Sequence, residues 1–186
     1  AVHVKDDTDV LGYFQSDAFF NKDDVMKWFT FNESLFESLR KKYAHINLSE
    51  ATSLHVRLGD YLNPSSLMFY APTPDYFKNA LKLLKPNGKI LIFSEDPIAA
   101  KQYLGDAGGG ENVVFIEGNK DYEDFYLMSL SKDIVCSAST FSWGAAYLNK
   151  HNDKRIIIPA SWFLPMCRIK NNDLFVEGWV RLKAHR

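Results

Sequence analysis

Short apolar runs alternate along the chain with longer amphipathic stretches. The runs are rich in Val and Ile and predict buried strands at 51–58, 89–94, 112–117, 133–138 and 155–159. The stretches before and between them have helical spacing, at 32–43, 74–85, 97–104, 122–132 and 141–150. This alternation predicts right-handed crossovers, and therefore an α/β fold with a parallel sheet and helices on both faces.

Local signals support several of the predicted helix ends. Asn32 is suited to cap the first helix, and Pro74 and Pro97 suit first-turn positions. The pair Asn87-Gly88 follows the helix expected at 74–85 and indicates where it stops.

Polar residues gather where four of the predicted strands end, at 57–61, 94–96, 117–119 and 137–141. In open α/β sheets, ligands bind outside the carboxyl ends of the strands. We therefore expect the four clusters to face one crevice.

The composition restricts the partners of the chain. Its 186 residues fit one domain, and the net charge of −1 argues against duplex DNA or an anionic membrane surface. A local basic pocket for a small anion stays possible. No segment reaches the roughly 18 apolar residues of a membrane span, and no signal peptide is recognisable. The first residue is Ala, which leaves open that the sequence is a piece of a longer protein.

The chain contains two cysteines, Cys136 and Cys167, without the spacing of a metal site. We expect free buried thiols in a reducing compartment and no structural zinc.

Six segments occur in a characteristic order and spacing. They are LGYFQS (11–16), HVRLGDY (55–61), TPDYFKNAL (73–81), FSEDP (93–97), DFYLMSLSKDIVCSASTFSWGAAYLN (124–149) and IIIPASWF (156–163). In these segments the sequence resembles the family 11 glycosyltransferases, the α-1,2-fucosyltransferases, over nearly its full length. One departure is Leu58, because the family usually has a second arginine after the one at Arg57. Related protein O-fucosyltransferases keep only the first.

The resemblance implies half of a GT-B fold, in which two Rossmann-like halves face each other across a cleft. The motifs belong to the C-terminal, donor-binding half. On this interpretation 1–50 is a leading segment with a strand or loop and a helix, and 51–186 is the donor-nucleotide domain. The acceptor-binding half, with any general base, is absent from this chain.

The implied reaction is the transfer of fucose from GDP-fucose to a galactoside hydroxyl, α-1,2-linked and inverting, without a metal or cofactor. The partners would be GDP-fucose, a glycan acceptor and the missing N-terminal half, with no nucleic acid, and this part alone can be inactive. Two alternatives stay open: a non-catalytic nucleotide-sugar or glycan-binding domain, and a glycosyltransferase using another nucleotide sugar. A bacterial or viral parent would be cytoplasmic, and a eukaryotic one membrane-associated or lumenal in the Golgi.

Arg57 is the candidate catalytic residue. As the glycosidic bond breaks, negative charge grows on the β-phosphate of the leaving GDP, and a fixed guanidinium can stabilise it with two parallel hydrogen bonds. His55 lies two residues earlier, so on a strand it projects to the same side as Arg57. It is either a donor-site residue or a core histidine whose ring is satisfied by a backbone carbonyl. Asp60 and Tyr61 are expected to shape the loop and orient Arg57. The alternative for Arg57 is a surface arginine at a strand end.

The junction at 137–144 is a second candidate anion site, because free N–H groups and the positive end of a helix dipole meet there. Thr140 and Ser142 are expected to offer hydroxyls to the diphosphate, with Ser139 and Phe141 in the same junction. Alternatively, Thr140 or Ser142 only caps the helix that begins near Phe141.

Asp124 is the candidate for reading the base. A carboxylate can accept hydrogen bonds from both the ring N–H and the amino group of guanine, a pair that adenine lacks. Acidic residues also favour first helical turns for their own sake. Ser94, Glu95 and Asp96 are expected to reach the nucleoside, and Ser94 can instead be a helix cap.

The sequence Asp7-Thr8-Asp9 spells the DxD pattern that binds a metal–diphosphate in another glycosyltransferase class. There it follows a nucleotide-binding half-domain, whereas only six residues precede it here. We interpret it as an acidic surface loop. No other carboxylate or histidine cluster has metal-ligand spacing, so we expect metal-independent chemistry.

Overall fold

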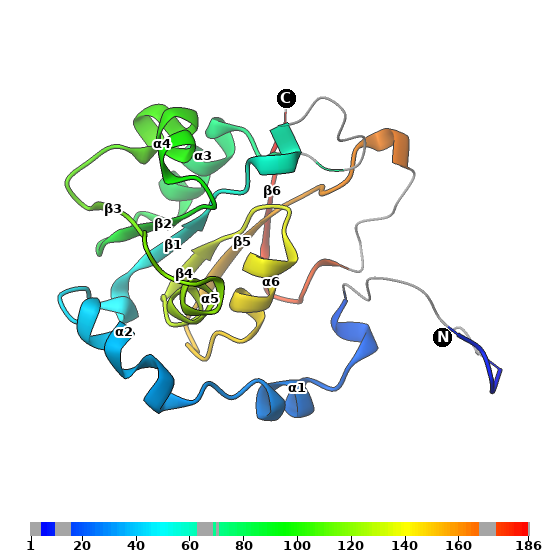
Figure 1. Cartoon of the computed structure of the whole chain (residues 1–186). Helices are drawn as coiled ribbons and strands as arrows, with labels where there is room; N and C mark the ends of the chain where they lie inside the picture. Colours follow the sequence, from blue (N-terminus) through cyan, green and yellow to red (C-terminus); the bar gives the residue numbers. More distant parts are fainter. Residues whose placement is uncertain (1–4, 10–15, 63–68, 70, 168–173, 186) are drawn as a thin grey trace.

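A six-stranded parallel sheet in the order β3-β2-β1-β4-β5-β6 forms the centre of the protein (Figure 1). The computed structural model describes residues 5–9, 16–62, 69, 71–167 and 174–185. The strands are β1 (Thr52–His55), β2 (Ile90–Phe93), β3 (Val113–Phe115), β4 (Asp133–Val135), β5 (Arg155–Pro159) and β6 (Val180–Leu182). All neighbouring strands pair in parallel, as the sequence predicts.

The α-helices of the described part of the chain connect and cover these strands. They are α1 (Lys22–Trp28), α2 (Glu37–Lys42), α3 (Pro74–Leu84), α4 (Pro97–Leu104), α5 (Asp121–Ser129) and α6 (Thr140–Tyr147). A 3-10 turn, Glu33–Phe36, precedes α2, and Asn32 caps it by accepting the amide of Ser34. The five predicted strands and five predicted helices are confirmed, although most are shorter than the sequence indicates. Helix α1 and strand β6 were not predicted.

Two hydrophobic cores pack against the two faces of the sheet. On one face, α3 and α4 contribute Tyr76, Phe77 and Leu104 to a core that includes Leu54 of β1. On the other face, α5 and α6 pack over residues of β2, β4 and β5, such as Phe93 and Ile134. Burial on both faces explains the continuous apolar runs of β2 and β5, since a strand with no wet face needs no polar alternation.

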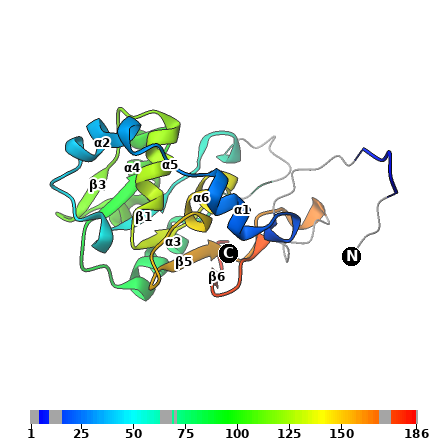
Figure 2. The same cartoon turned by 90° about the horizontal axis from the view of Figure 1, so that it is seen from below.

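The N-terminal segment shares the second core. Phe36, Leu39, Tyr43 and Ile46 are buried in it, and Figure 1 shows α1 and α2 running beneath α5 and α6. The described residues 5–9 instead lie well away from the sheet in both views (Figures 1 and 2). The predicted boundary at residue 50 thus separates two parts of the sequence that pack into one core.

The strand order contains a topological switch point. From β1 the chain builds the sheet in one direction through β2 and β3, and then returns to place β4 on the other side of β1. Such a reversal opens a crevice outside the carboxyl ends of the two strands, where doubly wound proteins bind ligands. The carboxyl ends of β1 and β4 are therefore the place to look for a site.

Two further predictions concern cysteines and membranes. Cys136 is a buried free thiol, as expected, whereas Cys167 is half-buried rather than buried. Among the described residues, no helix has the length and apolar character needed to cross a bilayer.

Candidate functional site

The carboxyl ends of β1 and β4 are joined by the hydroxyl of Ser137. It donates a hydrogen bond to the carbonyl of His55 (2.6 Å) and accepts one from the backbone N–H of Arg57 (3.1 Å). Ser137 is fully buried, so both hydrogen bonds are shielded from water. This bridge fixes the backbone of Arg57 at the switch point.

The guanidinium of Arg57 lies among two carboxylates and an aromatic ring. Its Nη2 donates to Oδ1 of Asp60 (2.9 Å), and its Nε lies 3.9 Å from Oε1 of Glu95. Its Cζ is 5.8 Å from the ring centre of Tyr61. The Arg57 side chain is 39% exposed, so solvent still reaches this charge.

Tyr61 and Glu95 hold the loop after β1 in place. The Tyr61 hydroxyl donates to the carbonyl of Ala138 (2.6 Å), and burial, followed by the charge of Asp60, raises the pKa of Tyr61 to about 12. Oε1 of Glu95 accepts the backbone N–H of Leu58 (2.9 Å). A Cβ at Gly59 would lie 2.9 Å from the same oxygen, so glycine permits this close approach. The loop is thereby tied to β2 and to the segment before α6.

His55 is buried beside α6, with its ring 5.3 Å from that of Phe141. Burial, and then the charge of Arg57, lowers its pKa from 6.5 to about 3, so the imidazole is neutral at physiological pH. Its Nδ1 is buried and has no hydrogen-bond partner among the described residues. A neutral ring with an unsatisfied polar atom at the crevice is unusual, since buried polar atoms are normally paired.

Helix α6 begins at the crevice, and its cap is Ser139, which accepts the N–H of Phe141 (3.3 Å). Thr140 is exposed. Ser142 is fully buried, and its hydroxyl donates to the carbonyl of Ser139 (3.2 Å). In this structure the Ser142 hydroxyl is thus engaged by the N-terminal end of α6, and its contact with a diphosphate stays a prediction.

Beyond β2, Ser94 accepts the N–H of Asp96 (3.3 Å), and Asp96 accepts the N–H of Ala99 (2.9 Å). Asp96 is therefore the cap of α4, and Ser94 supports it from outside the helix. Ser94 is half-buried and Asp96 exposed, so both lie at the surface of the carboxyl edge.

Beyond β3, Asp124 lies in the first turn of α5 and is half-buried. Its Oδ1 accepts a hydrogen bond from Nδ2 of Asn119 (2.8 Å). Burial raises the pKa of the Asp124 carboxyl, and the hydrogen bond from Asn119 opposes that shift.

The predicted clusters share one edge of the sheet, because all the strands run parallel and β3, β2, β1 and β4 are neighbours. Ser94, Arg57 and Ser139 lie in the loops that follow β2, β1 and β4, and Asp124 lies in the first turn of α5, the helix after β3. Arg57 and the start of α6 are adjacent. The contacts of Ser137, Asn119 and Lys42 were not predicted as site contacts. Ser137 and Asn119 carried a signal, because they belong to the polar clusters at 137–141 and 117–119, whereas Lys42 carried none.

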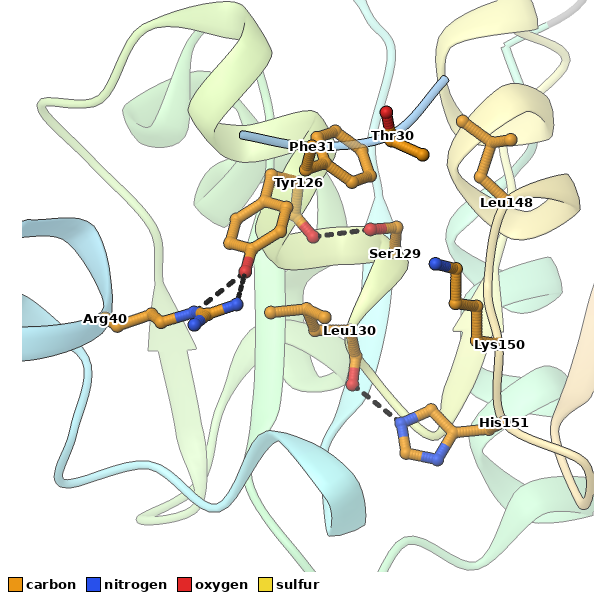
Figure 3. A pocket seen from close by; sticks show the side chains of 9 residues that line it. All are labelled: Thr30, Phe31, Arg40, Tyr126, Ser129, Leu130, Leu148, Lys150 and His151. Carbon is orange, nitrogen blue, oxygen red and sulfur yellow. Dashed lines mark hydrogen bonds between the residues drawn. The ribbon is translucent and has the colours of Figure 1, made fainter. Parts of the chain in front are cut away.

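A separate cavity of about 420 Å³ lies at the other end of α5 (Figure 3). Phe31 and Tyr126 contribute its aromatic surface, and Arg40, Lys150 and His151 its basic groups. Arg40 donates through Nε to the Tyr126 hydroxyl (2.8 Å), and His151 contacts the carbonyl of Leu130. None of the predicted site residues lines this cavity, so it is distinct from the crevice.

Asp7 and Asp9 of the DxD pattern are exposed, as expected of a surface loop. In the described ranges no three His, Cys, Asp or Glu side chains gather as metal ligands would. LGYFQS lies outside the described residues except for Ser16, which caps a 3-10 turn.

Comparison with known sequences identifies the family. The sequence profile described as "Glycosyl transferase family 11" matches residues 7–183. The chain belongs to this family.

Relatives of this family 11 chain include two proteins of Escherichia coli. The O-antigen biosynthesis glycosyltransferase WbnK is 28% identical over 97% of the chain and 63% of its own length. An alpha-1,2-colitosyltransferase is 29% identical over 97% of the chain and 64% of its own length. A Caenorhabditis elegans protein, svh-11, named as a candidate galactoside 2-alpha-L-fucosyltransferase, is 30% identical over 56% of the chain and 32% of its own length. The family 11 chain thus spans less than two thirds of the length of these relatives.

Among solved structures, the UDP-GlcNAc 2-epimerase of Neisseria meningitidis is similar with a TM-score of 0.41 and 16% identity, over 74% of this chain and 33% of that one. Similarity at this level carries no argument about function. The α/β assignment of the family 11 chain rests on its own strand order.

Proposed function

We propose that this chain is the donor-binding part of an α-1,2-fucosyltransferase, which transfers fucose from GDP-fucose to a galactoside hydroxyl with inversion and without a metal. In this proposal the chain is the C-terminal half of a GT-B enzyme. The observation that carries it is the position of Arg57. It stands at the switch point, bridged by Ser137 to the strand that precedes α6.

Arg57 is suited to the β-phosphate of the donor. Its present partner is Asp60, through one hydrogen bond of 2.9 Å, and the Asp60 side chain is 60% exposed. An exposed ion pair of this kind contributes about 1 kcal/mol or less. A diphosphate offers more charge and several acceptor oxygens, so it can replace Asp60 on the guanidinium. The N–H groups at the start of α6 add a second set of donors next to it.

Asp124 is suited to the guanine base. One of its oxygens is held by Asn119, and no second hydrogen bond restrains the carboxylate among the described residues. An ionised carboxylate has about four lone-pair sites, so it can accept the ring N–H and the amino group of guanine as well. Arg57 follows β1, and Asp124 lies in the first turn of α5, the helix that follows β3, so the phosphate and base contacts come from different connections of the sheet.

A second candidate function concerns the transferred sugar. One relative that aligns over 97% of the chain is an alpha-1,2-colitosyltransferase, and another protein in the comparison is named for fucose. The residues assigned above contact the nucleotide, which both sugars would share. Transfer of colitose from a nucleotide donor is therefore the alternative. A general base and the acceptor pocket are assigned to the rest of the parent protein.

The test compares GDP with GMP, because only GDP carries a β-phosphate. By calorimetry, Arg57→Ala should weaken GDP binding by roughly 1.5–3 kcal/mol, the value of a lost hydrogen bond to a charged group, and leave GMP nearly unchanged. Arg57→Lys should also fail, because a point charge on a flexible stem cannot make the two-pronged contact. In the full-length parent, both variants should lose transfer.

Arg181→Ala provides a matched control. Arg181 is on the edge strand β6, where its guanidinium lies over the ring of Phe175, away from the switch point. GDP affinity should be unchanged in this variant. Equal weakening of GDP and GMP by Arg57→Ala would mean that Arg57 is structural, and the proposal would fail.

A further inference from the structure

Asn119 connects the candidate base-reading residue to a helix of the N-terminal segment. Its Nδ2 donates to Oδ1 of Asp124 (2.8 Å) and to the hydroxyl of Tyr43 (3.0 Å). Its Oδ1 accepts from Nζ of Lys42 (2.7 Å) and lies 3.3 Å from the Tyr43 hydroxyl. Both polar atoms of one amide are therefore engaged by three different side chains.

The orientation of this amide follows from the chemistry of its partners. An ammonium group can only donate hydrogen bonds, and an ionised carboxylate can only accept them. Lys42 therefore requires Oδ1 of Asn119 on its side, and Asp124 requires Nδ2 on the other. The reversed amide would lose both contacts, so the side chain has one favourable orientation.

The backbone around Asn119 is shaped for the same contacts. Gly118 has a φ of 69°, a left-handed conformation that residues with a side chain rarely adopt. This turn presents the carbonyl of Glu117 as well as Asn119 to Nζ of Lys42, which donates to that carbonyl at 3.1 Å.

Helix α2 is fixed to α5 independently of this network. Arg40 donates to the hydroxyl of Tyr126 near the other end of α5, where the close-up view shows the pair (Figure 3). Leu39 and Tyr43 are buried in the core beneath. Lys42 therefore projects from an anchored helix, and it can hold Asn119 in a fixed place.

We propose that Asn119 is a positioning residue for nucleotide recognition, which fixes the Asp124 carboxylate and makes Lys42 and Tyr43, at the C-terminal end of α2, part of the base-binding site. The role in recognition rests on the proposed function, in which Asp124 reads guanine. The positioning of Asp124 itself does not.

The charges around Asp124 give this positioning a measurable consequence. Burial raises the pKa of the carboxyl, and Asp121 and Glu123 on the same helix raise it further, whereas Asn119 and Lys42 lower it. Helix α6 packs against this part of α5 through the rings of Phe141 and Phe125, without a charged group. Asn119 and Lys42 thus oppose the upward shift of the Asp124 pKa and favour the ionised form, which accepts both guanine donors.

The first experiment needs no nucleotide. The carboxyl ¹³C signal of Asp124 is titrated by NMR in the wild-type chain, in Asn119→Ala and in Asn87→Ala. The Asn119 variant should titrate at higher pH than the wild type, because it lacks the hydrogen bond that favours the carboxylate. Asn87 is an exposed residue of the α3–β2 turn and takes part in none of the contacts described above, so its variant should titrate like the wild type.

The second experiment measures GDP and ADP affinities by calorimetry at several pH values. In Asn119→Ala the preference for GDP should fall by about three- to tenfold, with ADP affinity unchanged. The preference that remains should disappear at a higher pH than in the wild type, because protonation of Asp124 removes an acceptor. Lys42→Ala should shift the titration in the same direction, and Lys42→Arg should restore it by supplying a charged donor.

The outcomes separate the two proposals. An unshifted Asp124 titration in both Asn119→Ala and Lys42→Ala would overturn the positioning role, whatever nucleotide binds. If the variants shift the Asp124 titration but the wild-type chain binds GDP and ADP equally, Asn119 positions Asp124 and Asp124 does not read guanine. If Asn119→Ala does not fold, the Lys42 pair decides. Equal weakening of GDP and ADP would show a structural role only and would also overturn the proposal.

Discussion

Replacing Leu58 by arginine restores the residue pair that family members usually carry after the strand, and the structure predicts that this chain cannot accept it. Leu58 is 3% exposed and belongs to the core formed by α3 and α4, on the opposite face from Arg57. Loss of a buried leucine side chain costs about 2–5 kcal/mol. The aliphatic stem of arginine regains part of this, but its charge must then be buried or drawn out to solvent.

An uncompensated buried charge costs about 3–5 kcal/mol. The Glu95 carboxylate lies close to position 58, but its Oε1 already accepts the backbone N–H of Leu58 (2.9 Å). We therefore expect Leu58→Arg to destabilise the chain by about 3–5 kcal/mol. For a chain of this length that corresponds to a decrease in Tm of roughly 6–20 °C.

Urea unfolding followed by far-UV circular dichroism measures the change, with GDP binding measured in parallel. Leu58→Met serves as the control, because it conserves volume and should cost less than about 1.5 kcal/mol. If Leu58→Arg unfolds at the wild-type urea concentration and binds GDP more tightly, the side chain at 58 points to the ligand. The assignment of Leu58 to the core would then be refuted.

Three other perturbations test particular contacts. Ser137→Ala removes the hydroxyl that bridges β1 and β4, so the free energy of urea unfolding should fall by about 1–3 kcal/mol and GDP binding should weaken. Unchanged stability would contradict the bridging role of Ser137. The stability of the folded chain should fall as pH decreases from about 6.5 towards 3, because His55 takes up a proton in the unfolded chain but stays neutral when buried. His55→Gln should lose this part of the pH dependence. An identical pH profile in the variant would contradict the assignment. Gly88→Ala would place its Cβ 2.5 Å from the carbonyl oxygen of Glu50 and should destabilise the fold by about 1–3 kcal/mol. The Cβ of Gly109→Ala would have its nearest neighbouring atom at 3.6 Å, so this variant should be nearly neutral. Equal thermal stability of the two variants would contradict the clash at Gly88.

The sheet and its covering helices could be predicted from the sequence because buried strands and helices carry apolar residues in a recognisable pattern. Strand β2 is buried at every position, and its sequence Ile-Leu-Ile-Phe is continuously apolar. Strand β6 lacks such an apolar pattern, because Val180 and Arg181 are exposed and only three residues pair with β5. Helix α1 has no buried residue, so it lacks the apolar periodicity that marks a packed helix.

The sequence could predict which candidate site residues follow the ends of strands, but it could not predict their hydrogen-bond partners. The bond between Arg57 and Ser137 joins positions 80 apart, and that between Lys42 and Asn119 joins positions 77 apart. Such partners depend on strand order, which the local pattern does not contain. At the start of α6 three hydroxyl residues follow one another within four positions, and only the helix phase decides that Ser139 caps and Ser142 is buried.

The central position of β1 has a consequence for how the chain folds. β1 pairs on one side with β2, but its other partner is β4, where Thr52 meets Asp133. During synthesis one edge of this buried strand therefore stays unpaired until α5 and β4 have emerged. Parallel pairing between distant segments is slow, and an open strand edge can recruit other chains. We expect the docking of β4 onto β1 to limit the rate of folding, and chains that end before Asp133 to aggregate.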